Sequence, residues 1–419
     1  MDGEHWIPRA QLRDAALAGA AGGGSPRVRD VPADDPETTV TSLLAAEAAG
    51  AVPVLRDPAW PDDVVNRQLR LADEAAAQTR ASGGPDAAAS LLVLPTSGSS
   101  ASPRLVVRTA RSWLDSLDPF SAVTGISADT VVWAPGPTSS TLTLFAVWHA
   151  LARGLPVLAG GRWRGVVAAG PAAREADAVQ CVPAVLADVV AAREAGLLPR
   201  LRVAVVAGAA LPAPLRRRAE ACGLSVVEYY GATELSFVAV DADGTGLRPF
   251  PGVEVDVRSG EVWVRSPYLC RAYVDPTAPG PLRGDGDGWY CVGDLASQGA
   301  DGALSLRGRG GESVSVGGQI VLVADVEAVL GAVAGVGEVV CLGEPHARLG
   351  ERVVVAVRPF DGADPVPALR LAARTQLPPA ARPVRYVVLA DLPRTSGGKV
   401  ARAALRDQLT GAGRRDLPP

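Results

Sequence analysis

Lysine is almost absent from this chain of 419 residues. Of its 41 basic side chains, 40 are arginine and one is a lysine, Lys399, and they are balanced by 45 acidic side chains. The near-balance of charge and the absence of any basic tract argue against nucleic acid as a partner. A lysine-rich surface is excluded as well, so the single lysine stands out.

Histidine and cysteine are also scarce. The three histidines, His5, His149 and His346, are too few for a catalytic triad or a metal site built on histidine. The cysteines are odd in number and never form a C-x-x-C pair, which argues against a disulfide framework or a structural zinc site. They lie at positions Cys181, Cys222, Cys270, Cys291 and Cys341.

Long apolar runs are missing too. No stretch reaches the roughly 18 apolar residues of a membrane span. The acidic start, Met1 to Trp6, lacks the basic region and apolar core of a signal peptide. We therefore expect a cytoplasmic protein that binds no membrane. Hydrophobic residues still make up 48% of the chain, enough for the cores of two or three domains.

Up to Pro249, short apolar runs alternate with helical patterns. Residues 20–39 are rich in Ala, Gly, Pro and Asp and predict a loop or a poorly ordered segment. Helices are predicted over 40–49 and 64–81, and strands over 52–55, 91–94, 131–133, 155–158, 179–182, 203–206 and 226–227. Strands that alternate with helices predict an α/β domain with a mostly parallel sheet.

After Pro249 the pattern changes to an alternation with period two. Residues 253–257 and 261–265, separated by Ser259-Gly260, predict a hairpin, and 304–306 and 314–316 predict further strands. A smaller α+β unit follows, with helices over 323–330 and 367–375 and strands over 336–342, 353–357 and 386–389. We divide the chain into a large domain, 1–309, and a small domain, 310–419.

The first chemical motif is the loop from Thr96 to Arg104, which follows an apolar strand. Its glycine, backbone N–H groups and hydroxyls suit the oxygens of a phosphate. It is not the GxxxxGK[ST] loop, whose spacing and lysine it lacks. The alternative is a flexible Ser/Gly linker, against which the preceding strand argues.

Two carboxylate motifs follow. In the segment from Glu228 to Glu234, an aromatic ring could cover a purine and Thr233 could bond to a phosphate. Glu234 could bind Mg²⁺ through its carboxylate oxygens. In the segment 288–295, Asp294 follows a glycine turn and suits the two hydroxyls of a ribose. The alternatives are a strand end with its turn, and an Asx-type turn.

The last two motifs lie near the predicted domain boundary and near the C-terminus. Gly308-Arg309 continues through Glu312 to Gly317-Gly318. The segment 392–402 places Lys399 in a glycine-rich loop, where a lysine is a mobile cation able to reach an anion. The alternative is a solvated surface lysine.

Together, in this order, the five motifs resemble the acyl-adenylate-forming superfamily of acyl-CoA synthetases, peptide-synthetase adenylation domains and luciferase-like enzymes. The resemblance extends from about Val40 to the C-terminal region. It implies a large α/β domain with a β-rich part and a small mobile α+β domain. It also implies ATP-dependent activation of a carboxylic acid to an acyl-adenylate, with release of pyrophosphate, and then thioester formation with CoA. ATP, Mg²⁺ and CoA are the implied cofactors.

The resemblance also implies roles for single residues. The phosphates of ATP would be cradled by Thr96, Ser97, Gly98, Ser99, Ser100 and Arg104. The adenine would be bordered by Gly208, Ala209, Ala210, Tyr230 and Gly231. Asp294 and Arg309 would hold the ribose, Thr233 would touch the α-phosphate and Glu234 would bind Mg²⁺.

In the small domain, the resemblance assigns three functions. Glu312 matches the hinge about which this domain turns, and Gly317 and Gly318 match the channel of the thiol acceptor. Lys399 matches the lysine that bridges the substrate carboxylate and the phosphate during adenylation. A cation at that place offsets the charge that develops on the phosphate.

The sequence departs from the family pattern in several places. Ala101 replaces a glycine of the phosphate loop, Arg104 replaces a lysine, and Ser315 replaces a lysine of the small domain. The stretch 133–140 lacks the usual aromatic residue and histidine of the acyl site. We expect a small polar acyl pocket formed by Pro135, Thr138, Ser139 and Ser236. The alternative for its Ser and Thr residues is helix capping.

Among the subfamilies, the chain looks most like a short actinobacterial o-succinylbenzoate–CoA ligase, although the altered acyl site suggests another acid. Two other functions stay open. The acyl group could pass to a carrier protein or another nucleophile instead of CoA. The chain could also be a degenerate homologue that binds nucleotide without turnover, which the retained Glu234, Asp294, Arg309 and Lys399 oppose.

Overall fold

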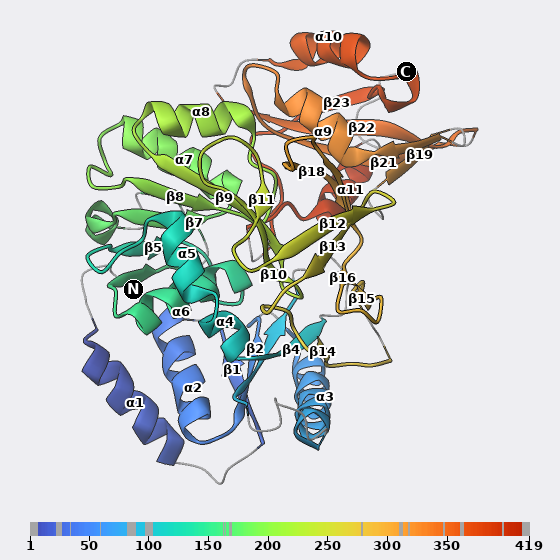
Figure 1. Cartoon of the computed structure of the whole chain (residues 1–419). Helices are drawn as coiled ribbons and strands as arrows, with labels where there is room; N and C mark the ends of the chain where they lie inside the picture. Colours follow the sequence, from blue (N-terminus) through green and yellow to red (C-terminus); the bar gives the residue numbers. More distant parts are fainter. Residues whose placement is uncertain are drawn as a thin grey trace.

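The described residues of the computed structural model form four β-sheets flanked by helices (Figure 1). They are residues 7–21, 27–33, 35–58, 60–81, 89–96, 104–161, 163, 165–166, 170–277, 280–309, 313–316, 319–346, 348–360, 364–395 and 398–412. Among them, no helix is both long and apolar enough to cross a membrane.

The first sheet has five strands in the order β1-β2-β3-β4-β14. They are β1 Val28–Pro32, β2 Val52–Arg56, β3 Leu91–Pro95, β4 Leu105–Thr109 and β14 Ala272–Tyr273. Strands β1, β2 and β3 run parallel, and β4 is antiparallel to both β3 and β14. The neighbouring helices are α1 Arg9–Ala21, α2 Pro36–Ala48 and α3 Asp62–Ala81.

The predicted loop over residues 20–39 is wrong for most of its length. Strand β1 forms there by pairing with β2, a contact that has no local sequence signature. Helix α2 begins there as well, because the Asp35 carboxylate accepts the Thr38 N–H at 2.8 Å and Pro36 occupies the first turn. The Asp and Pro residues taken as loop formers are therefore a helix cap.

The second sheet has the order β11-β10-β9-β8-β7-β5-β6. Its strands are β5 Val132–Ala134, β6 Val157–Ala159, β7 Ala178–Cys181, β8 Val203–Val206, β9 Ser225–Ala232, β10 Ser236–Asp241 and β11 Arg248–Pro249. From β6 to β9 neighbouring strands are parallel, which confirms the predicted α/β architecture. The helices are α4 Arg111–Leu114, α5 Leu117–Thr124, α6 Thr141–Arg153, α7 Pro183–Glu194 and α8 Ala213–Ala221, with a 3₁₀ helix at Pro171–Glu175.

The third sheet contains the predicted hairpin, and it has the order β15-β16-β13-β17-β18 with β12 paired to β13. The strands are β12 Glu254–Arg258, β13 Glu261–Arg265, β15 Arg283–Gly284, β16 Tyr290–Cys291, β17 Asp294–Gln298 and β18 Leu304–Arg309. One buried cluster connects the first three sheets, through residues such as Val31, Val205 and Val262.

The fourth sheet, at the top right of Figure 1, is formed by C-terminal residues in the order β20-β19-β22-β21, with β23 beside β22. The elements are β19 Ser313–Val316, β20 Gln319–Leu322, α9 Val323–Gly331, β21 Val336–His346, β22 Gly350–Pro359, α10 Val366–Gln376, a 3₁₀ helix at Pro379–Ala381, β23 Arg385–Val388 and α11 Arg402–Ala412. A buried cluster from Val314 to Ala381 belongs to these elements alone. The division at residue 309 stays a prediction.

Candidate functional site

The turn between β9 and β10 carries Thr233 and Glu234. Both side chains are buried, at 8% and 5% exposure. The Thr233 hydroxyl lies 3.3 Å from that of Thr141, the first residue of α6. Glu234 Oε1 accepts a hydrogen bond of 2.8 Å from the Tyr273 hydroxyl on β14. Three elements far apart in the sequence therefore meet at this turn.

Tyr273 is a residue of this site that the sequence analysis missed. Burial and the Glu234 charge raise the pKa of its phenol, so that it stays protonated and donates. Gly280 lies flat against the ring, because a Cβ atom there would sit 2.1 Å from Tyr273 Cζ. The Leu282 N–H donates to the Tyr273 oxygen at 3.3 Å, which fixes the hydroxyl further.

Arg108 on β4 was missed as well, although a lone charge within the apolar run Leu105–Thr109 is a visible signal. It is 1% exposed. Its guanidinium donates to the carbonyl oxygen of Thr233 at 3.2 Å and to Ser236 Oγ at 2.6 Å. These contacts bracket Glu234 on both sides.

The residues predicted to hold the adenine and ribose also lie together. The Tyr230 hydroxyl donates to Asp294 Oδ2 at 2.7 Å. Asp294 is the register partner of Arg309 across β17 and β18. Gly231 must be glycine, because a Cβ atom there would lie 2.0 Å from the carbonyl oxygen of Ser236. The structure thus brings the second and third motifs side by side.

The lysine loop of the C-terminal region lies against the large α/β part. A Cβ atom added at Gly208, whose φ is +88°, would lie 3.4 Å from Lys399 Cε and 3.3 Å from Val182 Cγ1. The loop itself is closed by the Thr395 N–H, which donates to the Lys399 carbonyl oxygen at 2.7 Å. Lys399 is half-buried. Its side chain therefore contacts the loop predicted to border the adenine.

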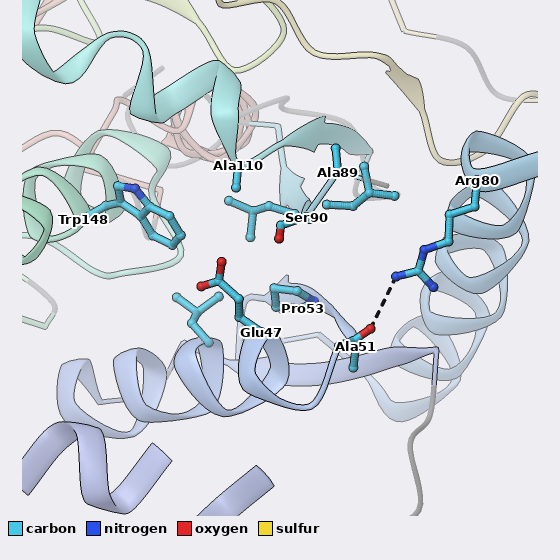
Figure 2. Close-up of a pocket in the computed structure, with 12 residues that line it drawn as sticks. Glu47, Ala51, Pro53, Arg80, Ala89, Ser90, Ala110 and Trp148 are labelled. Atoms are coloured by element: carbon cyan, nitrogen blue, oxygen red, sulfur yellow. Dashed lines mark hydrogen bonds between the residues drawn. The ribbon is translucent and has the colours of Figure 1, made fainter. Parts of the chain in front are cut away.

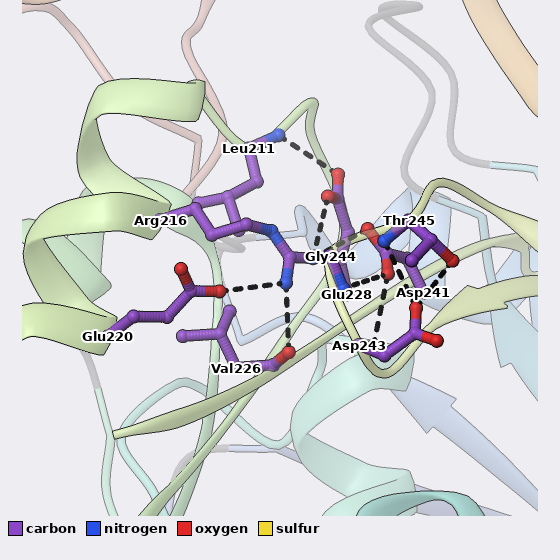
Figure 3. A network of polar contacts seen from close by, with 9 residues as sticks. All are labelled: Leu211, Arg216, Glu220, Val226, Glu228, Asp241, Asp243, Gly244 and Thr245. Atoms are coloured by element: carbon purple, nitrogen blue, oxygen red, sulfur yellow. Dashed lines mark hydrogen bonds and ion pairs between the residues drawn. The ribbon is translucent and has the colours of Figure 1, made fainter. Parts of the chain in front are cut away.

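A polar network ties that same loop to β9 (Figure 3). The Leu211 N–H donates to Glu228 Oε1 at 3.1 Å, and Glu228 Oε2 lies 3.4 Å from Arg216 of α8. Arg216 also pairs with Asp241 at 3.1 Å. Burial raises the pKa of Glu228, and the Arg216 charge and the Leu211 N–H oppose that shift. The network therefore joins Leu211, which follows the loop 208–210, to Glu228, which lies two residues before Tyr230 on β9.

The predicted acyl-pocket residues have mixed surroundings. Pro135 is buried, and Ser139 is half-buried. Thr138 is 1% exposed and its hydroxyl lies 3.1 Å from that of Thr39 on α2, so it packs between elements. Ser236 accepts a hydrogen bond from Arg108. Of these, Thr138 and Ser236 have hydroxyls that already make hydrogen bonds within the protein.

Several predicted residues lie outside the described part of the chain. They are Ser97, Gly98, Ser99, Ser100, Ala101, Glu312, Gly317 and Gly318. The ends of the phosphate loop are described, and there the Thr96 N–H donates to the Arg104 carbonyl oxygen at 2.8 Å. That bond extends the antiparallel pairing of β3 with β4 to Thr96 and Arg104, the two described ends of the loop.

A cavity of about 220 Å³ lies elsewhere in the large α/β part (Figure 2). Its lining includes Glu47 of α2, Arg80 of α3, Ser90 and Trp148 of α6. None of the predicted site residues lines it.

The donors around Glu234 suit Mg²⁺. This ion prefers oxygen ligands and usually takes one or two carboxylates together with substrate phosphates. Glu234 supplies a buried carboxylate, and the hydroxyl of the preceding residue, Thr233, lies 3.3 Å from that of Thr141. Among the described residues, no group of three or more His, Cys, Asp or Glu side chains could hold a metal. A shared protein–phosphate site therefore fits better than a closed protein cage.

Comparison with known proteins agrees with this arrangement. Residues 70–274 match the family model described as AMP-binding enzyme, and residues 325–399 match the AMP-binding enzyme C-terminal domain. A probable 2-succinylbenzoate–CoA ligase from Mycobacterium tuberculosis is 34% identical over 222 residues, which cover 51% of this chain and 56% of that protein. The chain thus spans little more than half the length of this relative.

Similarity extends to a second curated protein and to a solved structure. A medium/long-chain-fatty-acid–[acyl-carrier-protein] ligase from M. tuberculosis is 30% identical over 246 residues, which cover 50% of this chain and 45% of that protein. The fold is that of a variant of E. coli MenE with bound OSB-AMS, with a TM-score of 0.79, 21% identity, and coverage of 97% of this chain and 94% of that one. The chain therefore belongs to the AMP-binding enzyme family of adenylate-forming ligases.

Proposed function

We propose that this protein activates a carboxylic acid with ATP and transfers the acyl group to CoA. In the first half-reaction a carboxylate oxygen attacks the α-phosphorus of ATP, and the bond from that phosphorus to pyrophosphate breaks. In the second, the sulfur of the thiol attacks the acyl carbon, the bond to AMP breaks, and the thiol proton is lost. The acid would be a small-molecule substrate.

The observation that carries this proposal is the contact between the Lys399 side chain and the Gly208 loop. Residues 208–210 and Tyr230 are the predicted adenine border, and the Glu228–Leu211 bond joins them. A cation that enters from the small domain at this place could lie between two anions, the substrate carboxylate and the α-phosphate. Holding both anions in line lowers the barrier by positioning and by charge stabilisation.

The remaining residues supply the nucleotide contacts. Asp294, held by Tyr230, would accept hydrogen bonds from the ribose hydroxyls. Thr233 would donate to the α-phosphate, and Glu234 would hold Mg²⁺, which when bound neutralises the charge on pyrophosphate. Thr96 to Ser100 with Arg104 would hold the outer phosphates. No general base is required for adenylation, which agrees with the shortage of histidine.

The acceptor has a second candidate. A relative that is 30% identical is named as an acyl-carrier-protein ligase, which makes a carrier protein the second candidate acceptor. Carboxylate-dependent exchange of labelled pyrophosphate into ATP, measured across aryl, alkyl and amino acids, tests the adenylation step. Mass spectrometry after addition of CoA, or of a pantetheinylated carrier, then identifies the acceptor. If no acid supports exchange although ATP binds, the protein is a non-catalytic homologue.

A further inference from the structure

Arg108 is a buried charge whose hydrogen-bond partners, among the residues that the structure describes, are all neutral groups. Its side chain extends from β4 into the core and is 1% exposed. Burial lowers the pKa of its guanidinium to about 10, and attraction to the Glu234 carboxylate opposes this shift, so that the guanidinium remains charged near neutral pH. A buried charge is costly unless hydrogen bonds compensate it. The identity of those bonds therefore shows what the residue holds in place.

Four hydrogen bonds and one aromatic ring surround this guanidinium. Its Nε donates to Ser112 Oγ at 3.0 Å, and its carbon lies 5.2 Å from the centre of the Trp113 ring. Nη1 donates to the Thr233 carbonyl oxygen at 3.2 Å. Nη2 donates to Ser236 Oγ and to the Tyr268 carbonyl oxygen, each at 2.6 Å. The Nε atom thus holds the guanidinium to Ser112, which is close to Arg108 in the sequence. The two Nη atoms bind segments that are distant in the sequence.

These other segments are the turn on both sides of Glu234 and the segment that begins at Tyr268. Thr233 precedes it, and Ser236 follows it with a φ of +58°, a conformation that is unusual for a residue other than glycine. Tyr268 lies two residues before Cys270, whose N–H donates to the Glu234 carbonyl oxygen at 2.8 Å. One planar group therefore fixes the turn before and after its carboxylate-bearing residue.

The strand that carries Arg108 also positions the direct partner of the carboxylate. Tyr273, which donates to Glu234 Oε1, is the register partner of Val106 on β4. From adjacent strands, Tyr273 thus binds the Glu234 carboxylate directly, and Arg108 binds Thr233 and Ser236 on either side of Glu234. The same β4 leads out of the predicted phosphate loop, which ends at Arg104.

We propose that Arg108 is a positioning residue for Glu234. Through its hydrogen bonds to Thr233, Ser236 and Tyr268, Arg108 holds the turn so that the Glu234 carboxylate can bind Mg²⁺ held by ATP. This proposal rests on the role of Glu234 given above. Residues that orient a metal ligand typically change metal affinity or activity by about 10- to 100-fold when they are replaced. Arg108 itself contacts neither the metal nor the nucleotide.

The test is the effect of Mg²⁺ on ATP binding, measured by titration calorimetry in EDTA and at saturating Mg²⁺. In the wild type, Mg²⁺ should strengthen ATP binding. In Arg108→Met, which keeps much of the side-chain volume and removes the donors, that gain should fall by about tenfold. Affinity in EDTA should change by less than about threefold, because the other nucleotide contacts remain. Arg111→Met, an exposed arginine on α4, is the matched control and should keep the wild-type gain.

Arg108→Lys keeps the charge but cannot bridge the two carbonyl oxygens and Ser236 together, so it should lose part of the gain. If Arg108→Met does not fold, Arg108→Lys decides. In a Glu234→Gln background, Arg108→Lys should cause no further loss of Mg²⁺-dependent ATP affinity, because residue 234 no longer binds the metal.

The proposal is overturned if a folded Arg108 variant shows the same Mg²⁺-dependent increase in ATP affinity as the wild type. It is also overturned if Arg108→Lys lowers ATP affinity further in the Glu234→Gln background. A wild type that gains nothing from Mg²⁺ overturns it together with the role of Glu234. A wild type that gains from Mg²⁺ but exchanges pyrophosphate with no acid contradicts only the proposed function, and the Arg108 measurements still decide the positioning role.

Discussion

The Tyr230 hydroxyl donates a hydrogen bond of 2.7 Å to Asp294 Oδ2 and thereby joins β9 of the parallel sheet to β17 of the β-rich sheet. The two residues are 64 positions apart in the sequence. A carboxylate held in this way loses little further freedom when it binds a diol. The pairing therefore gives the predicted ribose site a defined geometry without a bound nucleotide.

Replacement of this hydroxyl should weaken nucleotide binding. Tyr230→Phe removes a hydrogen bond to a charged group, a change that typically costs about 1.5–3 kcal/mol, so the KM for ATP should rise by about tenfold or more with a smaller change in kcat. Tyr268→Phe removes a bond of 3.0 Å to the Pro251 carbonyl oxygen and serves as the control. Equal KM values in both variants would contradict an ordering role for Tyr230.

Lys399 should matter for one half-reaction only. Lys399→Ala should slow acyl-adenylate formation by about 100- to 1,000-fold, the usual cost of removing one group that stabilises a transition-state charge. Thioester formation from supplied acyl-adenylate should remain largely intact, because the acyl phosphate bond already exists. Pyrophosphate exchange and a single-turnover thioester assay measure the two steps. Similar losses in both would refute this division of labour.

Gly231 should not tolerate a side chain. In Gly231→Ala the added methyl would meet the Ser236 carbonyl oxygen at 2.0 Å, so the β9–β10 pairing must shift, and unfolding free energy should fall by about 3 kcal/mol. Gly161→Ala is a suitable control, since nothing lies within 4 Å of its added atom. Urea denaturation of both variants measures the difference. Retention of wild-type stability by Gly231→Ala would show that the turn can relax.

His149 should make the fold sensitive to mild acid. It is fully buried, with Nε2 2.8 Å from Ser121 Oγ, and burial, helped by the Arg153 charge, lowers its pKa from 6.5 to about 4. Between these values the unfolded chain binds a proton that the folded chain does not, so stability falls as pH falls. From about pH 7.5 to pH 5 this residue should remove about 2 kcal/mol.

The measurement is the free energy of unfolding of the wild type and of His149→Gln at both pH values. Other titrating groups are common to the two proteins, so the difference between their pH slopes reports His149. A variant that follows the wild-type slope would show that the buried imidazole does not carry this dependence.

The apolar run at 226–227 predicted the start of β9, but the strand continues through Tyr230 to Ala232. No strand was predicted at Asp294, where β17 begins, because the sequence there indicates only a glycine turn. Tyr273 could not be found from a local pattern. It lies 39 residues from Glu234 and reaches it only because β14 pairs with β4 in another sheet. Arg108 was detectable as a charge within an apolar strand, but its partners depend on the same long-range pairing. The loop predicted over 20–39 failed because composition outweighed the Asp35-Pro36 cap.

Strand β9 lies between β8 and β10, with register partners along both of its edges. It carries Glu228, Tyr230 and Gly231 and ends at the turn of Thr233. A shift of one residue in the register of a strand would turn all of its side chains to the opposite face of the sheet. The contacts of Glu228, Tyr230 and Gly231 can therefore change only together. Tyr230, Gly231 and Thr233, which are predicted to contact the nucleotide, therefore depend on one strand for their relative positions. A substitution on β9 that displaces one of these residues is therefore expected to displace the others as well.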